Sequence, residues 1–144
     1  MRRFPQQIER WLDALEGSCV MRQEKARRIV AKALSHFDGV RHQHHSWIVM
    51  PNHVHALVSI CDGWSFENVV QSWKGFSARE INRSNEKGGT LWQKDYFDRI
   101  IRNERHFWRC ARYIRQNPLN LPESDYSLWE SEVVREHSTP APIA

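Results

Sequence analysis

The chain has 144 residues, 40% of them hydrophobic, which allows one domain with a real core. It is too short for a metal-dependent hydrolase built on a TIM barrel, which needs about 250 residues. Lys and Arg outnumber Asp and Glu by 21 to 17, a formal charge of +4 that favours a polyanionic partner. We expect no membrane span, no secretory signal and therefore a cytoplasmic protein.

Two amphipathic helices are predicted at the start of the chain. Apolar residues recur at spacings of three and four over residues 8–15 and again over 26–37. A break near Gly17 separates the two runs, and the second ends before Asp38-Gly39, a turn signal.

The stretch from Ser46 to Ile60 changes to the alternation of β-strands, with Pro51-Asn52 as a turn in its middle. This pattern predicts a hairpin. Three histidines precede it, His42, His44 and His45. We interpret them as part of a solvated loop that enters the strand, with a second metal cluster as the alternative. If the strand starts early, His44 and His45 alternate faces.

Two more helices are predicted from their caps. Ser65 can cap a helix that runs to Ile81, and Asn103 can cap a last helix that Pro118 stops. Mixed helices and strands predict an α+β domain in which helices cover an antiparallel sheet. Only two strands are evident from the pattern, and two are too few for a stable sheet.

The chain is predicted to divide near Asn120. Beyond this residue the sequence shows little periodicity and several prolines. We therefore expect one domain over residues 1–121 and an irregular C-terminal tail over 122–144.

Two histidines one residue apart occupy the second predicted strand, in "WIVMPNHVHALVSI". Because residues i and i+2 of a strand project from the same face, His53 and His55 lie side by side, and Val54 and Ala56 take the other face. Two neutral imidazoles at this spacing can hold one divalent cation. The alternative is a pair of exposed or hydrogen-bonded histidines on a half-solvated sheet.

The last predicted helix carries a tyrosine beside an arginine stripe. Tyr113 and Asn117 lie one turn apart and point the same way, and Arg105, Arg109 and Arg112 lie next to Tyr113. Guanidinium groups beside a hydroxyl suit phosphodiester chemistry, since they can hold phosphate oxygens bidentately. The alternatives are a solvated helix face for the arginines and helix-stop chemistry for Asn117.

Four motifs together resemble the REP-associated tyrosine transposases, a branch of the single-tyrosine HUH nucleases in the IS200-like transposase family. The resemblance covers approximately residues 10–121 and is specific because the motifs occur together, in order and at the right spacing. They are "MPNHVHALV" (50–58), "WKGFSA" (73–78), "LWQKDYFDRIIRNE" (91–104) and "YIRQNPLN" (113–120).

The resemblance implies a ferredoxin-like antiparallel sheet and a metal-dependent reaction on DNA. By position, His53, His55 and Asn117 would bind Mg²⁺ or Mn²⁺, and Tyr113 would attack single-stranded DNA at hairpin elements. The product would be a covalent 5′-phosphotyrosine and a free 3′-OH, which permits later joining of ends. Tyr96 is the other tyrosine within the motifs, where packing or DNA contact is expected.

The resemblance also indicates a DNA-binding surface. The residues expected to contact the backbone are Lys74, Lys94, Arg99, Arg105, Arg109 and Arg112, and Trp92 or Trp73 could stack on unpaired bases. A monomer or a homodimer is compatible with the family. The competing interpretation is a non-catalytic or degenerate DNA-binding relative, which would need neither the metal nor the tyrosine.

One feature of the family is missing from the sequence pattern. Relatives begin with an aromatic-rich strand in the middle of the sheet, whereas "MRRFPQQIERWLDALEG" is already helical by Trp11 in our interpretation. We therefore expect a sheet without its usual first strand, through truncation or an unrecognised upstream start. The alternatives are pairing supplied by another segment or a second chain, or a rearranged sheet.

Overall fold

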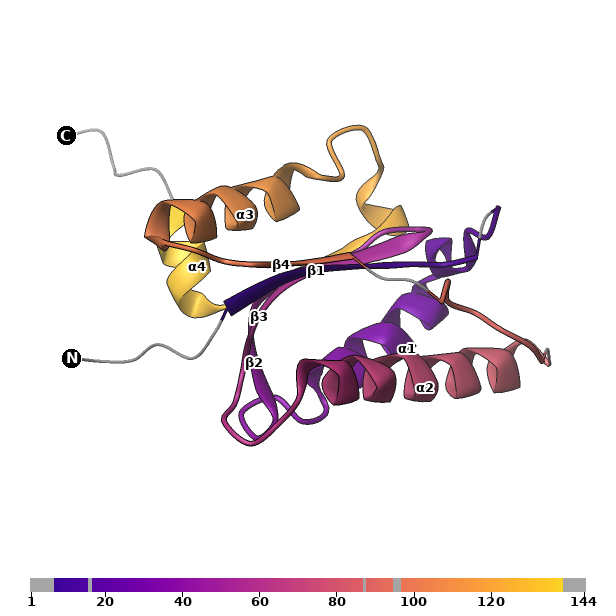
Figure 1. Ribbon diagram of the computed structural model, residues 1–144. Helices are drawn as coiled ribbons and strands as arrows, with labels where there is room; N and C mark the ends of the chain where they lie inside the picture. The colour runs from indigo at the N-terminus through magenta and orange to yellow at the C-terminus, as the bar shows by residue number, and fades with distance from the viewer. Residues whose placement is uncertain (1–6, 16, 87, 95–96, 139–144) are drawn as a thin grey trace.

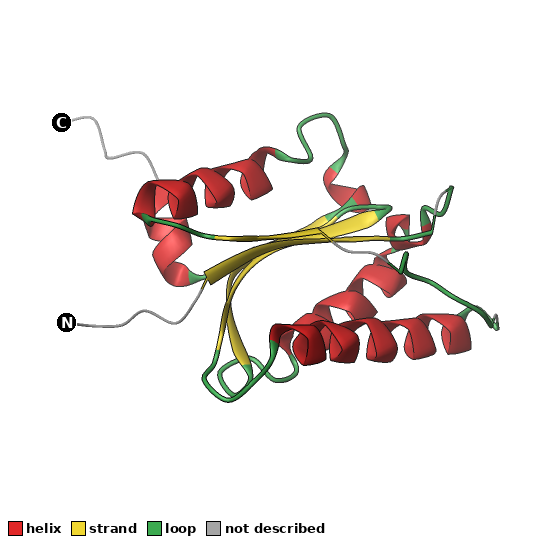
Figure 2. Ribbon diagram, in the orientation of Figure 1, coloured by secondary structure: helices red, strands yellow, loops and turns green. Residues whose placement is uncertain are grey.

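The computed structural model describes residues 7–15, 17–86, 88–94 and 97–138. Helices cover both faces of a single sheet: α1 and α2 lie on one side, and α3 and α4 on the other (Figures 1 and 2). The elements in chain order are β1 (Gln7–Asp13), η1 (Val20–Arg22), α1 (Glu24–Ser35), β2 (His42–Val49), β3 (His53–Ile60), α2 (Phe66–Ser84), β4 (Phe97–Ile100), α3 (Glu104–Gln116), η2 (Glu123–Asp125), β5 (Ser127–Glu130) and α4 (Glu132–Ser138).

The sheet is antiparallel throughout and has the strand order β4-β1-β3-β2-β5. It confirms the predicted α+β class with helices over an antiparallel sheet. Within the described ranges, no helix has the length and apolarity that crossing a bilayer requires.

Strand β1 shows that the first predicted helix and the missing central strand were both wrong. Ile8 and Leu12 lie four residues apart, a spacing that fits a strand face as well as a helix face. The charges of Glu9 and Arg10 argued against a buried strand, because charged residues are rarely buried. Both residues are nevertheless buried here. Arg10 pairs with Asp98 of β4 at 3.1 Å. Long-range partners therefore allow a charged sequence to form an interior strand.

The predicted hairpin forms as β2 and β3. The helices predicted over residues 26–37, after Ser65 and after Asn103 form as α1, α2 and α3. The two strands are joined at Pro51-Asn52, and residues of both are deeply buried. Ser65 accepts a hydrogen bond from the backbone N–H of Asn68, and Asn103 accepts one from that of His106, so both predicted caps form. Val54 and Ala56 face the core under α1 and α2, as predicted.

The C-terminal segment is not irregular up to residue 138, which corrects the predicted tail; residues 139–144 lie outside the described residues. Strand β5 pairs with β2, and Trp129 of β5 stacks on Trp47. The Arg115 guanidinium donates two hydrogen bonds to the Glu130 carboxylate, at 2.8 and 2.6 Å. Val134 of α4 is fully buried. Weak periodicity reflects short elements stabilised by contacts with the rest of the fold.

His42 and His44 are buried in β2, so the solvated-loop interpretation of these residues was wrong. Their Nε2 atoms lie 2.8 and 2.9 Å from the carbonyl oxygen of Leu34, in the last turn of α1. The Trp73 ring stacks on His44. The strand does start early, and His45 faces the other side, against Ser59 and Phe107. The side chains of His42 and His44 thus lie within hydrogen-bond distance of a carbonyl in the last turn of α1, where a helix leaves its carbonyls without partners of its own.

We expect the fold to lose stability in mild acid through His44. Burial, aided by neighbouring His42, lowers the pKa of His44 to about 3. The unfolded chain takes up this proton near pH 6.5, so the stabilising effect is complete above pH 6.5 and declines as the pH falls toward 3. The free energy of unfolding should drop by about 1.4 kcal/mol per pH unit in this window.

Urea unfolding between pH 7 and pH 5 measures this loss. His44→Gln should be less stable at pH 7 but should show a shallower pH slope. His36→Gln, which alters an exposed histidine, is the matched control and should keep the wild-type slope. Equal slopes in His44→Gln and wild type would contradict the assignment.

Candidate active site

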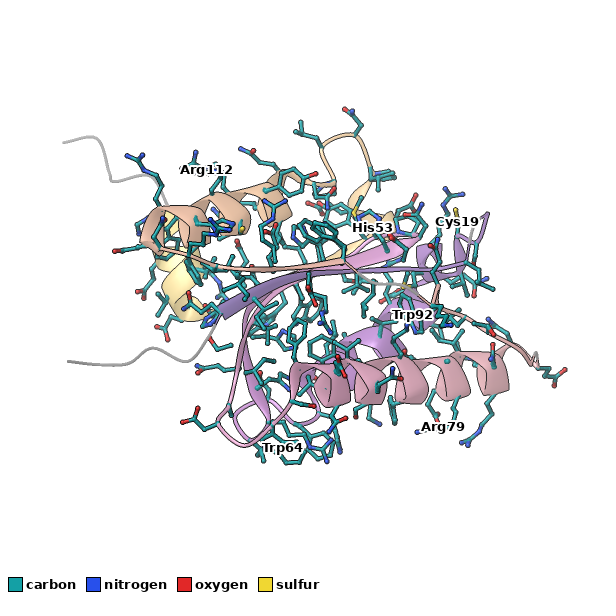
Figure 3. The ribbon with its side chains drawn as sticks, viewed as in Figure 1. Cys19, His53, Trp64, Arg79, Trp92 and Arg112 are labelled. Carbon is teal, nitrogen blue, oxygen red and sulfur yellow. The ribbon has the colours of Figure 1, made fainter. Side chains whose placement is uncertain are left out.

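The histidine pair and the helix tyrosine come together on the α3 side of the sheet. His53 of β3 points to this side in Figure 3. The amide nitrogen of Asn117, at the C-terminal end of α3, lies 3.4 Å from His53 Nε2. The Tyr113 ring contacts the His55 ring edge to face, with centroids 5.6 Å apart. The two predicted i, i+4 helix residues therefore each face one of the two histidines.

His53 is held by two polar neighbours. Its Nδ1–H donates to Asn52 Oδ1 at 2.8 Å, which leaves the lone pair on Nε2. Burial is the main reason that the pKa of His53 is lowered, so the ring is neutral at pH 7. Nε2 is therefore an available acceptor or ligand atom that faces Asn117.

His55 is fully buried and fixed from three sides. Its Nε2–H donates to Glu9 Oε1 at 3.1 Å. The Trp11 ring stacks on it with centroids 4.2 Å apart, and Tyr113 approaches its edge. Burial lowers the pKa of His55, although Glu9 opposes this. With the proton on Nε2, the lone pair is on Nδ1, which has no hydrogen-bond partner among the described residues.

Glu9 is the site residue that sequence analysis missed. Oε1 accepts from His55, while Oε2 lies 3.7 Å from His106 Nε2 of α3. Burial alone would raise the pKa of Glu9, but hydrogen bonds from His55 and Cys110 outweigh it and lower the pKa. The same burial raises the pKa of Cys110 to about 12, so the thiol remains a donor. Alternation along β1 was the sequence signal for Glu9, and the helical spacing of Ile8 and Leu12 obscured this signal.

We expect the Glu9 carboxylate to stabilise the fold through its hydrogen bond with buried His55 of β3. Glu9→Ala would leave the buried Nε2–H of His55 without its acceptor, which costs about 1–3 kcal/mol. Urea unfolding at pH 7 measures this loss. Glu132→Ala, on an exposed glutamate of α4, should change stability by less than about 0.5 kcal/mol. An equally small effect of Glu9→Ala would contradict this role.

The predicted basic residues fall into two groups. Arg105, Arg109 and Arg112 are exposed along α3, and Arg112 points away from the sheet in Figure 3. Arg99 is exposed on β4, on the same face as Glu9, with which it is paired across β1 and β4. Lys94 is exposed in the loop before β4. Arg99 lies across from Glu9, and Arg109 lies one turn from Tyr113, so these two residues border the histidine and tyrosine site.

Three residues predicted as DNA contacts lie on the other side of the sheet. Trp92 is 4% exposed, and its indole N–H donates to Ser77 Oγ at 2.9 Å, so base stacking by Trp92 was a wrong prediction. Trp73 is equally buried, as the structural alternative for it required. Lys74 of α2 donates to the carbonyl oxygen of Gln93 at 2.8 Å, in the layer opposite α3. Tyr96 lies outside the described residues.

Groups of metal-ligand type occur at two places among the described residues. Each has ligand atoms within 4.8 Å of one another; one group is Glu9, His106 and Cys110, and the other is Asp38, His42 and His44. The first adjoins the His53 and His55 pair through the Glu9 hydrogen bond to His55. The protein therefore has residue groups that could hold a metal ion.

Comparisons with known proteins identify the family. The sequence model of the family "Transposase IS200 like" matches residues 19–117. A protein of uncharacterised function from Haemophilus influenzae is 22% identical over 108 residues, 60% of this chain and 55% of that protein, so the match spans about half of the relative.

Two solved structures share the fold. A REP-associated tyrosine transposase bound to a REP hairpin aligns with a TM-score of 0.62 and 17% identity, over 83% of this chain and 72% of that one. A proposed transposase from Deinococcus radiodurans R1 aligns with a TM-score of 0.50 and 19% identity, over 81% and 97%. Since the family model covers more than half of the sequence, the chain belongs to the IS200-like transposase family.

Proposed function

We propose that this protein cuts and rejoins single-stranded DNA at hairpin elements, with Tyr113 as the nucleophile. One observation carries the proposal: Tyr113 is 56% exposed and contacts the ring of His55, while Asn117 one turn later contacts His53. An accessible tyrosine side chain beside a neutral imidazole, with a second imidazole beside Asn117 one helical turn away, suits nucleophilic attack on a phosphate.

The reaction exchanges one phosphodiester for another. The Tyr113 oxygen bonds to phosphorus, the bond from phosphorus to the 3′ oxygen breaks, and the leaving oxygen takes up a proton as a free 3′-OH. A 3′-OH from a second strand can attack the 5′-phosphotyrosine in the reverse sense and join the ends. No cofactor is consumed, because the energy of the broken bond is kept in the phosphotyrosine.

The residues fit a divalent cation of the Mg²⁺ or Mn²⁺ kind. His55 has a buried, unpartnered Nδ1 lone pair, and His53 Nε2 faces Asn117, whose side chain presents its oxygen after half a turn of the amide. Glu9 orients His55 from behind, as carboxylates commonly do for metal-binding histidines. A cation held by these residues would polarise the attacked phosphate and stabilise charge on the leaving oxygen.

The DNA path is proposed along the exposed basic residues on the same side of the sheet. Arg109 and Arg99 border Tyr113 and β4, with Arg105, Arg112 and Lys94 farther out. Guanidinium groups hold phosphates in place without reading sequence. The solved structure with TM-score 0.62, described as bound to a REP hairpin, supports a hairpin as the DNA partner.

A covalent adduct tests the proposal directly. The protein should be incubated with end-labelled hairpin oligonucleotides that carry single-stranded arms, with and without Mn²⁺, and run on a denaturing gel. We expect a protein-linked DNA band that requires Mn²⁺. Binding in a native gel with no adduct under any condition would favour the competing function, a non-catalytic DNA-binding relative that keeps the arginines alone.

A further inference from the structure

An aromatic surface lies next to the candidate active site and has no role in the chemistry proposed above. Phe97 of β4 is 54% exposed, although it is a large apolar side chain. It lies directly across from Trp11 of β1, with ring centroids 5.0 Å apart, and Trp11 in turn stacks on His55. The rings of Phe97, Trp11, His55 and Tyr113 thus form a continuous row that ends at the nucleophile.

The fold leaves this end of the row uncovered. Helix α3 packs on β2 and β3, whereas all four residues of β4 are exposed. Trp11 is partly exposed between them. The exposed parts of Phe97 and Trp11 therefore lie beside the Tyr113 flank of α3. We call this surface the step.

Positive charge borders the same step. Arg99, two residues from Phe97 on the same strand face, lies with its guanidinium carbon 5.8 Å from the Phe97 ring centroid. Arg109 is also exposed and lies one turn before Tyr113 on α3, so guanidinium groups from β4 and α3 flank this surface. An aromatic surface edged by guanidinium groups matches an unpaired nucleotide, whose base stacks while its phosphate is held.

We propose that Phe97 and Trp11 stack against an unpaired base of the DNA strand beside the phosphate that Tyr113 attacks. This inference rests on the proposed function for the identity of the ligand. It replaces the predicted stacking by Trp92, which is buried on the opposite side of the sheet. The alternative is an aromatic pair that only stabilises the pairing of β1 with β4.

The test uses hairpin oligonucleotides with 2-aminopurine placed in turn at each unpaired position of the arms, in the absence of Mn²⁺. We expect wild type to quench fluorescence at one position or two adjacent ones. Phe97→Leu should lose this quenching and bind the armed hairpin about 5- to 100-fold more weakly, the range for one base stack. Phe97→Tyr should retain both properties, and binding of a hairpin without arms should be unchanged in all variants.

Ile100→Ala is the matched control, because Ile100 lies on the same strand with the same exposure, 54%, but on the opposite face. It should bind and quench as wild type does. If Phe97→Leu, folded as judged by its melting temperature, binds and quenches like wild type, the inference is overturned. The Mn²⁺-dependent adduct of wild type is scored separately, so quenching without an adduct overturns only the proposed catalysis, and an adduct without quenching overturns only the stacking.

Discussion

Tyr113→Phe is expected to abolish the covalent protein-DNA adduct while hairpin affinity stays within about threefold of wild type, since binding rests on phosphate contacts and stacking. The substitution removes only the hydroxyl, and the ring that contacts His55 remains. A denaturing gel measures the adduct, and a native gel with the same oligonucleotide measures affinity.

Tyr126→Phe is the matched control for this prediction. Tyr126 is partly buried beside the core under α3, and among the described residues it has no hydrogen bond or ring contact with His53 or His55, so its adduct should equal that of wild type. Adduct formation by Tyr113→Phe would reject Tyr113 as the nucleophile and would direct attention to Tyr96.

His53→Ala combined with His55→Ala is expected to eliminate both cleavage and Mn²⁺ binding. The two residues supply the lone pairs that face Asn117 and the buried side of the site. Removing only an outer partner of a ligand commonly weakens metal affinity 10- to 100-fold, so losing two ligands should cost about 100-fold or more. Electron paramagnetic resonance of free Mn²⁺ measures the affinity without any need for activity.

Because His55 is fully buried, folding of the double variant must be checked by its melting temperature. His53→Ala alone, at a partly exposed position, provides a second variant that should fold and still lose most Mn²⁺ affinity. His36→Ala controls for the loss of any histidine, since His36 is exposed at the C-terminal end of α1. Unchanged Mn²⁺ affinity in a folded His53→Ala protein would exclude this site.

Local signals predicted the hairpin, the later helices and the placing of the histidine pair. Alternation put His53 and His55 on one face because a strand repeats every two residues, whatever its partners. Helical spacing put Tyr113 and Asn117 on one flank of α3 for the same kind of reason. The contacts between these two pairs could be anticipated only through the family resemblance, because no local rule states which helix covers which face.

The failures have one physical cause. Glu9 and Arg10 are acceptable inside β1 only because His55 and Asp98, far away in the sequence, satisfy them. The burial of Trp92 depends likewise on Ser77 of another element. Such residues look polar, helical or exposed when considered with their neighbours alone. Long-range pairing decided their structure, and it also placed Glu9 at the candidate site.

The strand order has a consequence for the time at which the candidate site can assemble during synthesis. Ile8 of β1, an interior strand, pairs with Val58 of β3 and, at the other edge of β1, with Ile100 of β4. A growing chain therefore cannot pair the outer edge of β1 until Ile100 has left the ribosome, and Tyr113 emerges later still. Pairings of such sequence separation also form slowly. A partly synthesised chain accordingly lacks an assembled candidate site.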